Sequence, residues 1–250
     1  MPPESEVEET HWWFIGRRSL IEATIRRGGV AASARILDVG AGTGSNLRLL
    51  SRIGFEQVWA VDRSPIAAAY CQAHIAGRVQ VADAKALPFA DGGFDCVLAT
   101  DVIEHVDDDD QALSEIARVL RPGGTAVIMV PAFPSLWGIS DEVGRHYRRY
   151  RLRPLVRIIE GAGLSVSLAR YFNYILFVPI WLLRVLMRAF NIRPQSEGDL
   201  NTAWLNRVLT WLFLFDVRTA MLIRPPFGVS ILAVCRKPNR DHAMEIESAE

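Results

Sequence analysis

The chain has 250 residues, half of them hydrophobic, and its 28 lysine and arginine residues balance its 28 aspartate and glutamate residues. This length and apolar content suffice for one elaborated globular domain. Because the net charge is zero, no overall positive field attracts nucleic acid, and we expect no nucleic-acid partner. Cys71, Cys96 and Cys235 lack paired spacing, so the sequence predicts neither a disulfide framework nor a zinc site.

The N-terminal segment predicts a helix after a polar start. Residues 1–9 lack the basic and apolar regions of a signal peptide, so we expect a cytoplasmic protein. Three neighbouring aromatic residues, among them Trp12 and Trp13, lead into a helical pattern that contains Arg17. Aromatic side chains in such a group need a surface to cover, and they either cap the core or cover a nearby ligand site.

A glycine-rich turn follows the first predicted strand. The apolar run at 36–39 predicts a short buried strand, and the leucine-rich pattern at 44–53 predicts a helix. Gly40, Gly42 and Gly44 lie between them, where the absence of a Cβ permits positive φ and lets a ligand approach the backbone. The unpaired N–H groups at the start of the helix then face that ligand. Several classes of nucleotide-binding fold share this pattern.

The chain from residue 34 to 132 alternates between strand-like and helical patterns, which predicts a parallel sheet with helices on both faces. The predicted strands are 36–39, 58–62, 79–83, 94–100 and 125–130, and the predicted helices are 44–53, 65–75 and 109–119. Ser64 suits the N-cap of the second helix. Pro122–Gly124 is predicted as the turn into the fifth strand.

Acidic residues mark the ends of four of these strands, namely Asp38, Asp62, Asp83 and Asp101. Parallel strands deliver such residues to one carboxyl edge of the sheet, where open α/β sheets bind ligands. The acidic run 107–110 differs, because it lacks the alternating ligand spacing of a calcium loop. It suits the positive end of the third helix dipole instead, so we expect no metal ion there.

Together with the motifs at 87–89, 101–106 and 120–124, these features resemble the class I S-adenosylmethionine-dependent methyltransferases of the type 11 group, which is related to the ubiquinone and menaquinone biosynthesis methyltransferases. The resemblance covers residues 36–163. It implies an α/β, Rossmann-like fold with a seven-stranded, mostly parallel sheet and helices on both faces. It further implies an N-terminal lid helix, a helical insertion before the last strand, and methyl transfer from S-adenosylmethionine.

The resemblance also assigns roles to individual residues. It places Asp38 or backbone groups at the ammonium of the cofactor, Asp62 at both ribose hydroxyls, and Asp83 at the adenine amino group. The cofactor-binding residues implied in this way are Asp38, Gly40, Gly42, Gly44, Asp62, Arg63, Asp83, Ala84 and Asp101. The lid position implies that Trp12, Trp13 and Arg17 line the substrate site.

The segment 141–150 leaves the carboxyl edge of the fifth strand and carries most groups that could recognise a methyl acceptor. His146 could accept a proton, and Tyr147 or Tyr150 could stack or donate. Arg148 and Arg149 could hold an anionic group, or they could order the loop by pairing with nearby carboxylates. His105 is a second candidate base, although its position also suits a structural histidine that begins the next helix.

More than fifty residues separate the sixth predicted strand, 164–170, from the last one, 228–236. Within them, the apolar segments 174–188 and 204–218 are interrupted by charges, so neither predicts a transmembrane helix. Both suit helices that lie in a membrane interface with their arginines toward headgroups. Packing against the core or forming a homodimer would use the same apolar surface.

The sequence therefore predicts a methyltransferase for a small or lipid-linked acceptor, cytoplasmic or peripheral to the inner face of a membrane. A cofactor-binding scaffold without turnover is the alternative. A dinucleotide-dependent oxidoreductase would require glycine or alanine in place of Ser45 and gives Asp83 no role. The predicted divisions are a tail and lid at 1–30, a methyltransferase core at 31–170, the insertion at 171–226, a final strand at 227–238 and a disordered tail at 239–250.

Overall fold

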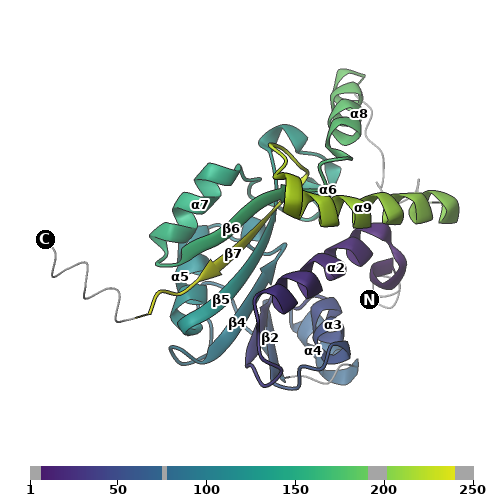
Figure 1. Ribbon diagram of the computed structural model, residues 1–250. Helices are drawn as coiled ribbons and strands as arrows, with labels where there is room; N and C mark the ends of the chain where they lie inside the picture. Colours follow the sequence, from purple (N-terminus) through teal and green to yellow (C-terminus); the bar gives the residue numbers. More distant parts are fainter. Residues whose placement is uncertain (1–6, 75–77, 191–201, 240–250) are drawn as a thin grey trace, which may run out of the picture.

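A seven-stranded sheet forms the centre of the computed structural model, which describes residues 7–74, 78–190 and 202–239 (Figure 1). Its strand order is β3-β2-β1-β4-β5-β7-β6. The strands are β1 (Ile36–Val39), β2 (Val58–Asp62), β3 (Arg78–Val81), β4 (Phe94–Thr100), β5 (Leu120–Pro131), β6 (Ser165–Phe172) and β7 (Ser230–Arg236). Strand β7 runs antiparallel to both neighbours, and the other pairs are parallel. The predicted Rossmann-like fold class is confirmed.

Helices cover both faces of the sheet and enclose two hydrophobic clusters (Figure 1). One cluster lies beneath η1 (Ile103–His105), α5 (Asp109–Val119) and α7 (Leu152–Gly161). The other lies beneath α2 (Trp12–Arg27), α3 (Ser45–Arg52), α4 (Pro65–His74) and α9 (Ala203–Ile223). A helical turn at residues 7–10 and three short or peripheral helices, η2 (Pro134–Leu136), α6 (Ile139–Val143) and α8 (Phe177–Ala189), complete the described structure.

Predicted helix starts are confirmed by their capping bonds. Ser64 Oγ accepts a hydrogen bond from the Ala67 N–H at 3.3 Å. Asp108 Oδ1 accepts one from the Gln111 N–H at 3.0 Å. The acidic run therefore satisfies the first turn of α5, as the sequence pattern indicates.

The predicted turn at Pro122–Gly124 is wrong, because β5 begins at Leu120 and includes these residues. Gly123 has a φ of +74°, a conformation that an L side chain rarely adopts. This local irregularity accompanies a register shift between β4 and β5. The strand is held there by backbone bonds between Gly123 N–H and Lys237 C=O at 2.8 Å and between Lys237 N–H and Gly124 C=O at 3.0 Å. Lys237, which follows β7, therefore continues the pairing with β5 into the predicted turn.

Helices α2 and α9 form a close pair, although nearly 200 residues separate their starts. Trp13 stacks on Phe213 with ring centroids 5.2 Å apart, and the Trp12 N–H donates to Asn206 Oδ1 at 2.8 Å. A Cβ on Gly16 would lie 2.1 Å from the Phe213 ring, so a glycine is needed for this approach. One face of α9 is thereby part of the core.

The other part of the insertion, α8, has no buried residue and projects away from the sheet (Figure 1). Within the three described ranges, no helix has the combination of length and hydropathy that crossing a membrane requires. The predicted domain divisions stay predictions, and most of the predicted tail, together with residues 1–6, falls outside the described residues.

Candidate active site

The glycine turn after β1 presents an open backbone surface. Gly42 has a φ of +53°, and a Cβ added there would meet no heavy atom within 4 Å. Gly40 is packed, because its Cβ would lie 2.4 Å from Val102. The N–H groups of Gly40 and Ala41 both donate to Val61 C=O, at 2.8 and 2.9 Å. The turn is thus fixed to β2 from below while its upper surface at Gly42 can receive a ligand.

Asp62 joins the end of β2 to this turn. Its Oδ2 accepts from the Gly42 N–H at 2.8 Å, and its Oδ1 accepts from the Ser64 N–H at 2.8 Å. A carboxylate offers about four acceptor positions, so each oxygen can accept one more hydrogen bond. The half-buried side chain of Asp62 therefore holds the turn and can still bind a pair of hydroxyl groups.

Asp38 lies beneath the turn and is fully buried. Its Oδ1 accepts from Asn46 Nδ2 at 2.8 Å, and the same amide donates to Thr100 Oγ1 at 3.0 Å. Burial raises the pKa of Asp38 to about 7, against the opposing effects of the Asn46 hydrogen bond and the charge of Arg17. Asp38 therefore ties β1 to α3 and, through Asn46, to β4.

Arg17 and Asp101 form an ion pair at the carboxyl edge of the sheet. Arg17 Nε lies 2.9 Å from Asp101 Oδ2, and its Nη2 donates to Thr100 C=O at 2.8 Å. Asp101 has a φ of +57°, an uncommon conformation for a residue with a side chain and one that occurs often at functional sites. The pair places a cation and an anion side by side above the end of β4.

The N-terminal segment reaches the glycine turn through residues 7–10, whereas its tryptophans pack on α9. Residues 7–10 form a helical turn, where Glu8 hydrogen-bonds Thr43 and forms an ion pair with Arg48. Trp12 and Trp13 instead pack on α9, as described above. Of the three residues expected to line the substrate site, Arg17 lies at the sheet edge, where it contacts Thr100 at the end of β4 and Asp101.

The remaining predicted cofactor residues follow β2 and β3 at the same edge. Asp83 is exposed and lies two residues beyond the end of β3, where its Oδ1 accepts from the Lys85 N–H at 2.9 Å. Ala84 is nearly buried, and Arg63 is exposed beside Asp62. Since β2 and β3 are parallel neighbours, these residues flank Asp62 on the side away from β4.

The loop between β5 and α7 is organised around the buried carboxylate of Asp141. It accepts from the Gly138 N–H at 2.7 Å, from Arg149 Nε at 2.7 Å, and pairs with His146 Nδ1 at 2.8 Å. Burial alone would raise the pKa of Asp141, but the bonds from His146 and Arg149 outweigh it and the pKa is lowered. Arg149 thus orders the loop.

Arg148 and Tyr150 also have partners within the chain. Arg148 forms an ion pair with Asp109. The buried Tyr150 donates its hydroxyl hydrogen to Asp109 Oδ2 at 2.8 Å, and burial and this carboxylate raise the pKa of the phenol. Tyr147 is exposed, and its N–H donates to Glu104 C=O at 2.7 Å. These contacts favour a structural role for Tyr150 and Arg148 over direct recognition of an acceptor.

The two candidate bases lie together, although 41 positions separate them in the sequence. The rings of His105 and His146 are perpendicular, with centroids 4.4 Å apart. Burial lowers the pKa of His105, and the neighbouring His146 lowers it further. Sequence reasoning missed Glu104, which is 1% exposed and lies against both rings. Its place between Asp101 and His105 in the run after β4 was the available signal.

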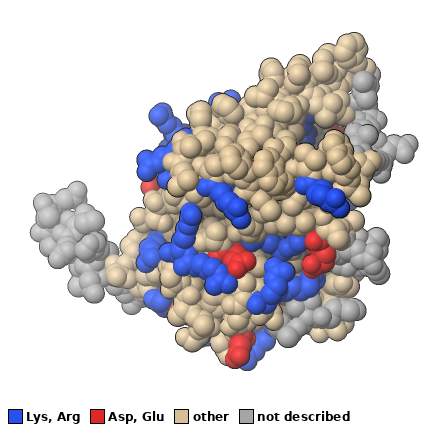
Figure 2. Space-filling model, turned by 45° about the vertical axis from the view of Figure 1, so that its right-hand side comes forward, with Lys and Arg blue, Asp and Glu red and all other residues tan. Residues whose placement is uncertain are grey.

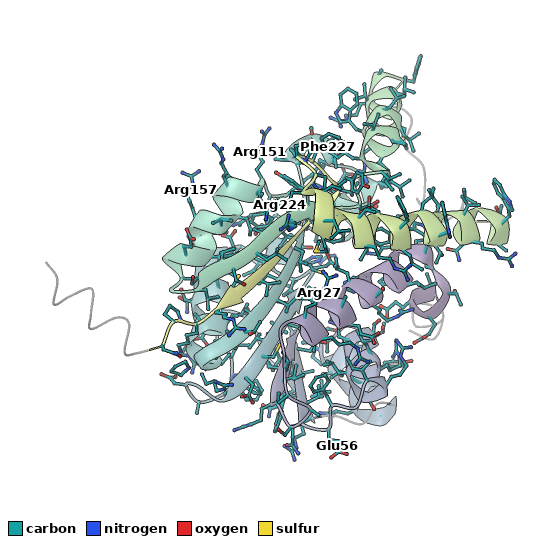
Figure 3. The ribbon with its side chains drawn as sticks, viewed as in Figure 1. Arg27, Glu56, Arg151, Arg157, Arg224 and Phe227 are labelled. Atoms are coloured by element: carbon teal, nitrogen blue, oxygen red, sulfur yellow. The ribbon has the colours of Figure 1, made fainter. Side chains whose placement is uncertain are left out.

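A cavity of about 690 Å³ lies elsewhere, between α7, β6 and the segment after α9. Arg151 and Arg224 line it and are labelled in Figure 3. It shares no lining residue with the glycine turn or the His105–His146 pair. Its size therefore does not make it the candidate active site, because the converging polar groups lie at the carboxyl ends of β1, β2 and β4.

Comparisons with known proteins agree with this arrangement. Residues 37–128 match the family model described as a methyltransferase domain. A ubiquinone/menaquinone biosynthesis C-methyltransferase of Hahella chejuensis is 38% identical over 119 residues, which cover 42% of this chain and 46% of that protein. The chain spans only about half to three fifths of the length of the curated relatives it matches first.

Two solved structures show the shared fold. A protein of Haloferax volcanii, solved in complex with the Trm112 methyltransferase activator, superposes with a TM-score of 0.63 at 22% identity, covering 95% of this chain and 94% of that one. A phosphoethanolamine N-methyltransferase 2 of Haemonchus contortus, in complex with S-adenosyl-L-methionine, gives 0.58 at 21% identity, covering 88% and 52%. The chain therefore shares its overall fold with both proteins.

Proposed function

We propose that this chain, which carries an S-adenosylmethionine-dependent methyltransferase domain of class I and the type 11 group, transfers the methyl group of that cofactor to a small or lipid-like acceptor. The observation that carries the proposal is the convergence of Gly42, Asp62 and Asp101 on one sheet edge. The family match over the strands that deliver these residues supports it.

The residues at this edge fit the cofactor. The open space at Gly42 admits a ligand against the backbone, and Asp62 retains acceptor positions for two ribose hydroxyls. Asp83 and the Ala84 N–H would meet the adenine ring. The Arg17–Asp101 pair offers one charge of each sign, which matches the carboxylate and ammonium of the amino-acid end.

The bound cofactor would supply the activated methyl carbon, so the chain's own contribution is placement and proton handling. Holding two reactants in line can supply roughly 7 to 11 kcal/mol of a barrier. His105 and His146 are the groups that could take a proton from the acceptor. The lowered pKa of His105 keeps its imidazole neutral near pH 7 and able to accept one.

A lipid-like acceptor is supported by the surface of the insertion. Apolar side chains on α8 and α9 are strongly exposed, among them Trp181, Phe190, Trp204 and Trp211. In Figure 2 the upper part of the visible face, where α8 lies, carries almost no charge. We further propose that this surface contacts a membrane or the apolar part of the acceptor. A homodimer would cover the same surface.

The cofactor assignment is tested by calorimetric titration with S-adenosylmethionine. Asp62→Ala removes charge-assisted acceptors worth about 1.5 to 3 kcal/mol, so we expect at least about tenfold weaker binding. Glu56→Ala is the matched control, because Glu56 is an exposed carboxylate at the opposite end of the molecule (Figure 3). Equal affinity of the Asp62 variant and the unaltered chain would overturn the ribose assignment.

Turnover is tested with the radiolabelled methyl group and a fractionated cell extract. Label in a lipid fraction would support the lipid-like acceptor, and label in a polar fraction would contradict it. A chain that binds the cofactor but labels no fraction would favour the scaffold alternative.

A further inference from the structure

Three side chains with metal-ligating atoms meet next to the proposed methyl-transfer site. They are Glu104 and His105 from η1 and His146 from the loop after α6. One ligand atom from each lies within 4.8 Å of the other two. The Tyr147 N–H bond to Glu104 C=O at 2.7 Å fastens the loop to η1 and so sets this arrangement. In the part of the chain that the structure describes, no other such group of three occurs.

The buried carboxyl group of Glu104 lacks a hydrogen-bond partner within the described residues. The residue is 1% exposed, and neither Oε1 nor Oε2 has a hydrogen-bond partner. Burying a carboxyl group without a partner is costly. A cation between Glu104 and the two histidines would remove this cost.

The two histidines are oriented as metal ligands usually are. Asp141 Oδ1 binds Nδ1 of His146 at 2.8 Å, which leaves Nε2 as the nitrogen that can ligate. The backbone of Gly144 hydrogen-bonds the ring of His105, which engages one of its nitrogens. Carboxylates and backbone carbonyls in this position fix the tautomer of a ligating histidine and raise its basicity.

The neighbouring charges leave one carboxylate available for the ion. Asp101 is paired with Arg17 at 2.9 Å, and Asp141 is paired with Arg149 at 2.7 Å. Both arginines also act on Glu104 at longer range, but neither is hydrogen-bonded to it. A divalent cation would therefore meet one carboxyl group that has no hydrogen-bond partner and two imidazole rings.

We propose that Glu104, His105 and His146 bind one divalent transition-metal ion, with Zn²⁺ as the reference ion. Two imidazoles and one carboxylate suit Zn²⁺ and its neighbours in the first transition row, whereas Mg²⁺ prefers oxygen ligands and keeps its waters. Three protein ligands leave at least one coordination position open. That number of ligands distinguishes the site from a closed structural zinc site.

The open position points to a role in acceptor binding, and this role rests on the proposed function. The site lies three residues from Asp101, at the edge where the methyl group would be presented. With the ion bound, His105 and His146 would act as ligands and not as bases. An oxygen of the acceptor bound to the ion would be held in place, and a bound hydroxyl would release its proton to solvent more readily. The acceptor class would then be one with a ligating oxygen, such as a phenol or an enol.

Metal binding is measured on the full chain without cofactor or acceptor, so that its outcome is independent of methyl transfer. The chain is stripped with a chelator and titrated with Zn²⁺ against a chromophoric competitor, and with Co²⁺ while visible absorption is recorded. We expect one equivalent of each ion and no competition by millimolar Mg²⁺. The Co²⁺ spectrum should lack a thiolate charge-transfer band, because the three proposed ligands bind through nitrogen and oxygen atoms.

Glu104→Gln and His146→Gln should each weaken Zn²⁺ binding by at least about 100-fold, the upper end of what loss of a supporting group alone produces. Glu142→Gln, an exposed carboxylate on α6, should bind like the unaltered chain. Without metal, Glu104→Gln should melt no lower than the unaltered chain, which separates lost ligation from misfolding. Failure of the unaltered chain to bind, or full binding by Glu104→Gln, would overturn the site while leaving the proposed methyl transfer standing.

Discussion

Asp38→Asn offers a direct test of how burial controls the charge beneath the glycine turn. The unaltered carboxyl has a pKa of about 7 in the folded chain against 3.8 when it is exposed. The folded state therefore binds this proton more tightly than the unfolded state does. Between these two pKa values the unfolded chain has released the proton and the folded chain has not, so stability falls as the pH rises.

The magnitude follows from the two pKa values. Linkage gives a loss of roughly 2 to 3 kcal/mol in the free energy of unfolding between pH 5 and pH 8 from this one group. Asparagine has nearly the same shape and keeps an oxygen for the hydrogen bond from Asn46 Nδ2. Its amide nitrogen replaces Oδ2, which has no partner in the unaltered chain. The variant should therefore lack this part of the pH dependence.

The assay is urea unfolding followed by tryptophan fluorescence at pH 5 and pH 8. Relative to Asp38→Asn, the unaltered chain should lose roughly 2 to 3 kcal/mol between the two pH values. Asp110→Asn, at an exposed carboxylate on α5, should show no such difference from the unaltered chain. The reasoning fails if the stability gap between Asp38→Asn and the unaltered chain is the same at both pH values.

Three further substitutions test the packing of α2 on α9, the hydrogen bond between Tyr150 and Asp109, and the exposed surface of α8. Phe213→Ala should lower the free energy of unfolding by about 3 to 5 kcal/mol and shift tryptophan emission, because Trp13 stacks on that ring; an unchanged urea midpoint would refute the close helix pair. Tyr150→Phe should cost about 1 to 3 kcal/mol, because it leaves Asp109 without its buried donor, which thermal melts can measure. Replacing Trp181 and Leu182 by serine should at least halve co-sedimentation with anionic liposomes; equal co-sedimentation, or a concentration-dependent dimer in its place, would refute membrane contact through α8.

The strands and their terminal carboxylates were predictable because the relevant signals are local. A buried strand reads as a short apolar run, and a parallel topology sends every strand end to one edge. Asp38, Asp62 and Asp101 follow from these two rules alone. The start of β5 did not follow, because its first residues pair through Gly123 with a segment more than 100 positions away.

The roles of Trp12, Trp13 and Glu104 could not be predicted for a related reason. Trp13 stacks on the ring of Phe213. Nothing near Trp13 in the sequence indicates this partner. The position of Glu104 between Asp101 and His105 indicates the sheet edge, but its contact with His146 arises only when the fold brings the next loop across. Contacts between residues far apart in the chain determine both roles, and local sequence patterns do not indicate such contacts.

Two arginines of α8 connect this helix to the loop between β5 and α7, which carries Asp141 and His146. Arg184 reaches the loop at Asp141, with 3.9 Å between Nη1 and Oδ2, and Arg188 donates to Ser135 C=O. A Cβ at Gly138 would overlap the Arg184 guanidinium, so the loop is shaped to receive it. The sequence pattern suggested that these arginines face lipid headgroups. Their inward direction instead leaves the outer face of α8 apolar and anchors it to the residue that orients His146.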